Sequence, residues 1–388
     1  MSDIKLPTAD RRVVSYRTRA PRDWTKANGG PRNRIFFSAA HVVSDPLADA
    51  DPWRSTALDW DATIAYRRYL WSLGLGVAEA MDTAQRGMGL DWPTALELIR
   101  RSVAAARDIP GALIFSGAGT DHLPLSPDVT LDDVIRAYEE QVDAIESVGG
   151  RIILMASRAL VAAAKTPDDY ALVYGRILGA VREPVIIHWL GEMFDPALAG
   201  YWGAPEHPAA MDICLGILAE HADKIDGIKI SLLDKDKEIA MRRRLPAGMR
   251  MYTGDDFNYP ELIAGDEDGH SDALLGIFDA IAPAASAALA ALGRGSINEY
   301  HDILAPTVPL SRHIFKAPTQ FYKTGIVFLA YLNGHQGHFR MLGGQESARS
   351  IPHLAEIFRL ADQAGILLDP DLATSRMRGI LQVAGIDV

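Results

Sequence analysis

Residues 226–231 are Asp226-Gly-Ile-Lys-Ile-Ser231, a short β-rich run, and residues 184–189, Pro184-Val-Ile-Ile-His-Trp189, form a similar run one helical segment earlier. Short apolar runs that alternate with segments of helical periodicity are typical of parallel βα units. From Arg34 onward the alternation repeats and predicts eight strands. They cover residues 35–43, 77–81, 112–116, 152–156, 185–189, 227–231, 250–253 and 273–278.

These units favour a (β/α)8 TIM barrel, because eight parallel strands joined by helices close more naturally into a barrel than into an open sheet. A Rossmann fold is not indicated, since no Gly-x-Gly-x-x-Gly turn follows the first strand. Beyond Pro283 the pattern is helical to the end of the chain. We therefore predict an N-terminal extension over 1–33, the barrel over 34–293, and a C-terminal helical region over 294–388 that packs on the barrel.

The composition is that of an ordinary globular protein and argues against a nucleic-acid partner. Apolar residues make up 48% of the 388 residues and charged residues 23%, as in ordinary globular proteins. The net charge of −11 argues against a nucleic-acid partner, which requires a concentrated basic surface. The basic cluster Arg242-Arg243-Arg244 lies in a helical stretch of mixed charge, so we interpret it as a solvated helix face.

Cysteine usage and hydropathy indicate the compartment. Cys214 is the single cysteine, which excludes an intrachain disulfide and a thiolate metal cluster and is consistent with a reducing environment. The N-terminal stretch has no apolar signal-peptide core, and no later stretch approaches the roughly 20 apolar residues of a membrane span. We expect a cytoplasmic protein without a membrane partner.

Lys229 is the first candidate catalytic residue. Alternate side chains of a barrel strand face the lumen and the surrounding helices. Because Ile228 and Ile230 share the helix-facing side, Lys229 should point into the lumen, where active sites gather at the carboxyl ends of the strands. Desolvation there lowers the pKa of an amine and frees it to attack a carbonyl. A lysine paired with a buried carboxylate, or one that binds phosphate, is the alternative interpretation.

Gly227-Ile-Lys-Ile-Ser231, followed by Tyr252-Thr-Gly-Asp-Asp256, resembles the dihydrodipicolinate synthase / N-acetylneuraminate lyase family of class I aldolases. In that family a Gly-[Ile/Val]-Lys strand supplies the Schiff-base lysine, and a Ser-Gly-Asp-Asp segment ends the next strand. The stretch from Gly269-His-Ser-Asp272 to Ile281-Ala-Pro283 occupies the place of the family's eighth strand. The resemblance covers residues 35–332 and implies a divergent branch with a barrel fold, a Schiff-base mechanism, and dimers or tetramers.

Two departures from the family pattern bear on the substrate. Where the family carries Gly-Thr-Thr-Gly-Glu, this chain has Met81-Asp-Thr-Ala-Gln85, so Thr83 is the one retained hydroxyl and Asp82 would repel a carboxylate. Where the family carries a tyrosine at the end of strand five, this chain has His188, which shares its face with Ile186. His188 could shuttle protons near neutral pH, or could be a buried structural histidine.

Several other polar residues near predicted strand ends are weaker candidates. Gly254, Asp255 and Asp256 end the seventh strand and are predicted to contact substrate, although one of the two acids could simply cap the following helix. Asp121-His122 could lie at the rim of the barrel. His335 and His338 lie in a glycine-containing stretch that indicates a helix-ending loop more than a metal site.

The sequence predicts a Schiff-base lyase, an aldolase or a dehydratase, that uses Lys229 and His188 without a cofactor or metal. Asp82, Thr83, Gly254, Asp255 and Asp256 would contact a keto acid or a sugar-derived carbonyl compound. A metal-dependent aldolase or isomerase is the main alternative, since a barrel can place oxygen and imidazole donors around a divalent ion. Its candidate ligands are Glu79, Asp82, His188, Glu192 and His207. A barrel that binds a metabolite without chemistry is the other alternative.

Overall fold

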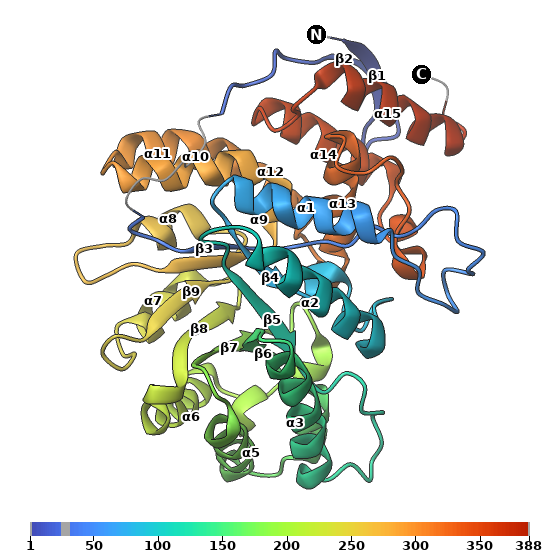
Figure 1. The fold of residues 1–388 in the computed structure, drawn as a ribbon. Coiled ribbons are helices and arrows are strands. Elements are labelled where there is room, and N and C mark those ends of the chain that lie inside the picture. Colours follow the sequence, from blue (N-terminus) through green and yellow to red (C-terminus); the bar gives the residue numbers. More distant parts are fainter. Residues whose placement is uncertain (1, 25–31, 387–388) are drawn as a thin grey trace.

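The computed structural model describes residues 2–24 and 32–386 and contains a closed barrel of eight parallel strands (Figure 1). Around the ring the strands follow the order β10-β3-β4-β5-β6-β7-β8-β9, so the last strand pairs with the first. The predicted (β/α)8 TIM barrel is therefore confirmed. The strands are β3 Phe36–Ala39, β4 Gly76–Glu79, β5 Ile114–Ala118, β6 Arg151–Leu154, β7 Val185–Leu190, β8 Ile225–Ser231, β9 Arg250–Thr253 and β10 Asp272–Leu275.

Helices follow each barrel strand and cover the outside of the ring, as Figure 1 shows. They are α1 Trp60–Ser72, α2 Trp92–Arg107, α3 Leu131–Ser147, α4 Arg158–Ala163, α5 Pro167–Ala180, α6 His207–Glu220, α7 Lys235–Arg242, α8 Tyr259–Ala264, α9 Ile277–Ala280 and α10 Ala282–Gly293. Local sequence determines several starts. In α3, for example, the Thr130 hydroxyl accepts from the backbone N–H of Asp133, while the Asp133 carboxylate accepts from that of Thr130.

The C-terminal region is helical, as predicted, and packs on one side of the barrel (Figure 1). Its helices are α11 Ile297–Leu304, α12 Val308–Ile314, α13 Tyr322–Leu332, α14 Ile351–Gln363 and α15 Pro370–Val383. The N-terminal extension contains an antiparallel hairpin that the sequence analysis missed, β1 Asp3–Pro7 with β2 Val13–Arg17. Tyr16 of this hairpin donates a hydrogen bond to Asp362 of α14, which ties the two ends of the chain together.

Two predicted strands end three or more residues earlier in the structure than in the prediction. The first ends at Ala39 rather than residue 43, and the backbone N–H of His41 donates to the Asp279 carboxylate instead of to a neighbouring strand. The last ends at Leu275 rather than residue 278. There the Asp256 carboxylate accepts from the backbone N–H of Ile277, where α9 begins. In both cases a buried aspartate from elsewhere in the chain accepts a hydrogen bond from a backbone N–H group, which would otherwise pair with a neighbouring strand.

The apolar core has three parts. Inside the barrel, side chains such as Phe37, Phe115 and Ile186 form the lumen cluster. Outside it, one cluster fills the space around α2, α3, α5 and α6. The largest cluster begins at Phe36 and continues without a break through Phe328 in α13 to Ile4 in the hairpin. Because this cluster crosses both proposed boundaries, the barrel and the flanking segments share one core, and the division at 34 and 293 stays a prediction.

None of the helices in the described ranges is long and apolar enough to cross a membrane. The basic cluster is paired with acids rather than free: Arg242 and Arg243 form ion pairs with Asp266, and Arg244 with Asp212. Arg243 and Arg244 are about half exposed, as a solvated helix face requires, whereas the side chain of Arg242 is buried.

Candidate active site

Lys229 lies on the lumen side of β8 close to its carboxyl end. Its neighbours Ile228 and Ile230 pack outward, as the alternation predicts. The Lys229 side chain is 7% exposed, and burial lowers the pKa of its amine, although Asp82 and Asp256 oppose that shift. Within the described part of the chain, neither acid comes close enough to Lys229 to form an ion pair. The amine is therefore near two carboxylates without being held by either.

His188 stands beside Lys229 on the adjacent strand. The two residues are register partners between β7 and β8, and His188 Nε2 lies 3.2 Å from Ser231 Oγ. His188 is 1% exposed, and burial together with the charge of Lys229 lowers its pKa well below 6.5. The imidazole is therefore neutral at physiological pH. The sequence placed His188 in the lumen. It did not indicate a lowered pKa, because the burial of the ring and its closeness to the charge of Lys229 both depend on the packed structure.

Gly254, directly after β9, lets the chain lie against the Lys229 side chain. A Cβ at this position would overlap Ser231 Oγ, and it would lie 2.6 Å from Ile230 O and 2.9 Å from Lys229 Cε. Real Cβ atoms essentially never approach other atoms this closely, so any larger residue would move either β8 or the lysine. Gly254 is therefore required because it leaves room for the Lys229 side chain, and not because of its backbone conformation.

Asp255 and Asp256 have different roles in the structure. Asp255 accepts hydrogen bonds from the backbone N–H groups of Phe257 and Asn258 and from the Asn258 amide, so it holds the turn before α8. Asp256 accepts from Ile277 N at 2.8 Å and is 4% exposed. Burial raises the pKa of Asp256 to about 7, against the opposing effects of that hydrogen bond and Lys229. Asp256 can therefore gain or lose a proton near neutral pH.

Asp82 and Thr83 begin the short turn Asp82–Ala84 that follows β4. Thr83 Oγ1 lies 2.8 Å from the hydroxyl of Tyr322, at the start of α13. Burial and the nearby carboxylate of Asp82 raise the pKa of Tyr322 well above 10, so the phenol stays protonated. Tyr322 could not be identified from the sequence, since α13 is apolar on almost every face and resembles a purely structural helix.

Two of the candidate residues, Asp82 and His188, line two adjoining cavities at the carboxyl ends of the strands. The other predicted catalytic and substrate-binding residues are not among the lining residues of either cavity: Lys229, Thr83, Gly254, Asp255 and Asp256. One, of about 200 Å³, has Asp82 and His188 in its wall, and the other, of about 220 Å³, has Tyr322 and Lys323. The cavities share a wall, since both are lined by Asp82, Arg86, Arg158, Leu190 and Asp195. Asp121, a rim candidate from the sequence, lines the first cavity and pairs with Arg86 at 2.5 Å. Arg158 pairs with Asp195.

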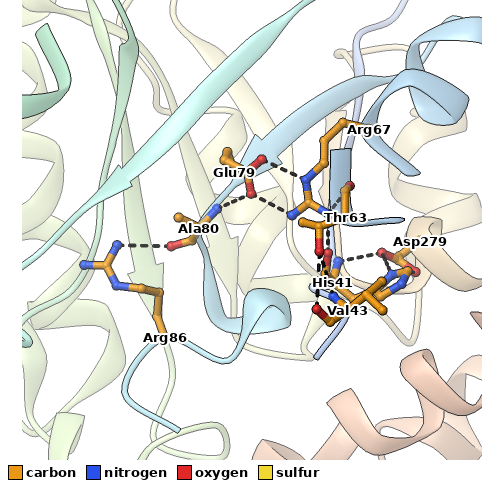
Figure 2. Close-up of polar contacts among 8 residues, drawn as sticks. All are labelled: His41, Val43, Thr63, Arg67, Glu79, Ala80, Arg86 and Asp279. Atoms are coloured by element: carbon orange, nitrogen blue, oxygen red, sulfur yellow. Dashed lines mark hydrogen bonds and ion pairs between the residues drawn. The ribbon is translucent and has the colours of Figure 1, made fainter. Parts of the chain in front are cut away.

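A buried polar chain leads from this wall into the layer between strands and helices (Figure 2). Arg86 donates to Ala80 O at 3.3 Å, and Ala80 N donates to Glu79 Oε1 at 2.8 Å. Both Glu79 oxygens accept from the Arg67 guanidinium, at 2.8 and 2.9 Å. The same guanidinium donates to the backbone oxygen of His41, whose ring lies 2.8 Å from the Asp279 carboxylate. Arg67, Glu79, His41 and Asp279 are all almost fully buried.

The residues considered as metal ligands are not brought together. Glu79 faces Arg67 and not the lumen, Glu192 is exposed, and the His207 ring stacks on Trp189. Among residues 2–24 and 32–386, no three His, Cys, Asp or Glu side chains are grouped so as to hold a metal ion. His335 packs against Tyr66 and Tyr69, and burial lowers its pKa to about 4. His335 lies, with His338, in the loop after α13, as the glycines predicted.

A family model described as "Protein of unknown function (DUF993)" matches residues 4–386. The chain belongs to this family. Comparison of the DUF993 chain with curated proteins finds no match. The family model thus spans the hairpin, the barrel and the C-terminal helices as one unit.

Solved structures that are similar to the DUF993 chain include members of the dihydrodipicolinate synthase family. YagE of E. coli K12, in complex with pyruvate, is 12% identical over 92% of this chain and 99% of that chain, with a TM-score of 0.63. The chloride-inhibited enzyme of Acinetobacter baumannii, complexed with pyruvate, is 17% identical over 86% and 99%, with a TM-score of 0.63. A monomeric synthase variant is 13% identical over 86% and 97%, with a TM-score of 0.64. The resemblance inferred from sequence is confirmed as a likeness of fold.

Proposed function

We propose that the protein is a Schiff-base-forming lyase that acts through Lys229 on a keto acid or a sugar-derived carbonyl compound. The observation that carries this proposal is the state of the lysine. It is buried on the lumen side of a barrel strand, burial lowers the pKa of its amine, and neither nearby acid is close enough to form an ion pair with it. A buried lysine with a purely structural role would be expected to form an ion pair with a carboxylate.

The neighbouring groups supply the proton transfers that imine chemistry needs. The neutral amine attacks the carbonyl carbon, the carbonyl oxygen takes up a proton, and water leaves to give a protonated imine. The proposed donor for this step is Asp256, because its pKa of about 7 allows it to be protonated at the working pH. His188, kept neutral by its low pKa, is the proposed base for the proton that is then removed from substrate.

Two reactions can follow from the same imine. In an aldol cleavage the carbon–carbon bond β to the imine carbon breaks, an aldehyde leaves, and the electron pair moves to the imine nitrogen as an enamine. In a dehydration a proton leaves the adjacent carbon and hydroxide leaves the next one. Reprotonation and hydrolysis restore the amine of Lys229 in either case. Asp82 and Thr83, in the turn after β4, would bind substrate hydroxyls, since carboxylates pair well with hydroxyl donors.

The decisive experiment is borohydride reduction of the protein with a panel of keto acids and keto sugars, followed by peptide mass spectrometry. We expect a reduced adduct on the peptide that contains Lys229, and none in Lys229→Ala. Lys235→Ala, which removes an exposed lysine six positions later in the chain, is the matched control and should still form the adduct. An adduct on Lys323, a second buried lysine that lines a cavity, or an adduct that persists in Lys229→Ala, would refute the proposal.

A further inference from the structure

Lys323, the second residue of α13, is a buried cation without a charged partner. It is 4% exposed, and its Nζ donates to Gln320 O at 3.0 Å and lies 3.3 Å from Met88 Sδ. An ammonium group has three donors, and the third contact of this one is with the face of the Tyr322 ring, 4.9 Å from Nζ to the ring centroid. All three partners are uncharged. No carboxylate in the described ranges is close enough to Lys323 to form an ion pair. A buried charge in this state lowers stability until an anion compensates it.

The cavity wall around Lys323 offers no other free cation among the described residues. Arg86 is held by Asp121 and Arg158 by Asp195, so both guanidinium groups already have an acid partner. Asp82, which lines the same cavity, interacts electrostatically with Lys323 and with Lys229 without forming an ion pair with either. The two buried lysines, one on the barrel and one on the C-terminal region, therefore both lie within electrostatic reach of Asp82.

We propose that Lys323 binds an anionic group of the substrate, a carboxylate or a phosphate, while Lys229 reacts with the carbonyl carbon of the same molecule. This inference rests on the proposed function of Lys229. It identifies the substrate class as a hydroxylated carbonyl compound whose anionic group is separated from the carbonyl carbon. Lys323 offers such an anion a place on the α13 side of the cavity, on a different element from Lys229.

The electrostatics of the reaction are consistent with this assignment. Burial lowers the pKa of Lys323 to about 8, so the side chain is mostly protonated at neutral pH and can pair with an anion. The form of Lys229 that attacks a carbonyl is the neutral amine, and its conversion into a protonated imine adds one positive charge to a buried site. A substrate that carries its own negative charge neutralises that addition, whereas a neutral substrate leaves it uncompensated.

Binding can be tested without any reaction by two pairs of ligands that have no reactive carbonyl. Gluconate and sorbitol share a polyol chain but only gluconate has a carboxylate, and glycerol 3-phosphate and glycerol differ by a phosphate. Isothermal titration calorimetry of the full chain should show at least one anion binding about tenfold or more tightly than its neutral counterpart, the scale of one charge-assisted hydrogen bond. Which anion is preferred distinguishes a sugar acid from a sugar phosphate.

Lys323→Gln should abolish this preference and leave the neutral ligands unaffected, and Lys323→Arg should retain part of it. The exposed Lys316, in the same C-terminal region, provides the matched control Lys316→Gln, which should behave as wild type. Lys323→Met tests for a merely structural role. If Lys323 serves anion binding, this variant should unfold at the same temperature as the ligand-free wild type or higher, because a buried uncompensated charge has been removed.

The outcomes separate this inference from the proposed function. Equal binding of anionic and neutral ligands by the wild type, or wild-type anion binding by Lys323→Gln, would overturn the role of Lys323. A lower unfolding temperature of Lys323→Met with unchanged anion binding would likewise make Lys323 structural. Conversely, selective anion binding that depends on Lys323, in a protein that forms no borohydride adduct at Lys229, would support the anion site and refute the Schiff-base mechanism.

Discussion

Replacement of Gly254 by alanine tests whether close packing at the end of β9 positions the reactive amine. The new Cβ would lie 2.6 Å from Ile230 O and 2.9 Å from Lys229 Cε, which is roughly 1 Å inside an ordinary van der Waals contact. Ile230 O belongs to the backbone of β8 and cannot rotate away, so either the strand or the loop after β9 must shift. Overpacking of this kind should cost about 1–3 kcal/mol of unfolding free energy.

The same shift should move Lys229 away from the carbonyl carbon. Misplacement by about 1 Å can slow a reaction by up to a hundredfold, so the rate of borohydride-trapped adduct formation should fall at least tenfold. Gly216, within α6, provides the control, because no atom beyond its chain neighbours and the backbone of its own helix lies within 4 Å of its Cβ position. Gly216→Ala should raise stability in urea unfolding by about 0.5–1 kcal/mol and leave adduct formation unchanged. Wild-type stability and adduct rate in Gly254→Ala would refute the packing argument.

Four further predictions concern His188, Asp256, the buried Arg67–Glu79 ion pair and the metal-dependent alternative. Because the pKa of His188 is lowered, turnover of a substrate that forms the adduct should fall only below pH 6.5. His188→Asn should flatten that limb and lower kcat about a hundredfold while the borohydride adduct at Lys229 still forms, and near-normal turnover with an unchanged profile would make His188 a packing residue. The pKa of Asp256 in the folded state is raised to about 7, so the unfolding free energy that its protonated form contributes at low pH is lost as the pH rises through 7. In urea unfolding, Asp256→Asn should therefore be more stable than wild type at pH 8, and this difference should shrink toward pH 4. Arg67→Met leaves Glu79 buried without its ion-pair partner and should lower the unfolding free energy, measured in urea, by about 3–5 kcal/mol. The double variant, Arg67→Met with Glu79→Leu, should recover much of that loss because it leaves no unpaired buried charge. Adduct formation at Lys229 should survive prolonged chelation, since the imine stabilises the carbanion, and a loss reversed by a divalent ion would favour the metal-dependent alternative.

The barrel and the lumen position of Lys229 could be predicted because both depend on local patterns. Alternation of apolar residues identifies each strand, and parity within β8 assigns Lys229 to the lumen whatever the rest of the chain does. His188 was placed by the same argument on β7. These inferences require only that the strands pair in parallel, which the βα rhythm already indicates.

Contacts between distant segments could not be predicted in the same way. The hydroxyl of Tyr322 meets Thr83 across 239 positions of sequence, and no periodicity in α13 distinguishes that tyrosine from its apolar neighbours. Asp279 ends the predicted first strand early through a hydrogen bond to His41 across 238 positions. The pKa of His188 likewise depends on the degree of burial and on which charge is nearest, and both are properties of the packed structure.

The position of α13 has a consequence for how the selectivity of the proposed enzyme could change. The barrel provides the amine that would react, whereas Lys323 and Tyr322 reach the cavity from a segment that takes no part in the strand ring. Exchange or redesign of that segment could therefore alter which molecules enter while the reactive lysine and its strand neighbours stay unchanged. Conversely, a barrel cut off near residue 293 would lack one side of its own binding cavity, together with much of the apolar cluster that stabilises it.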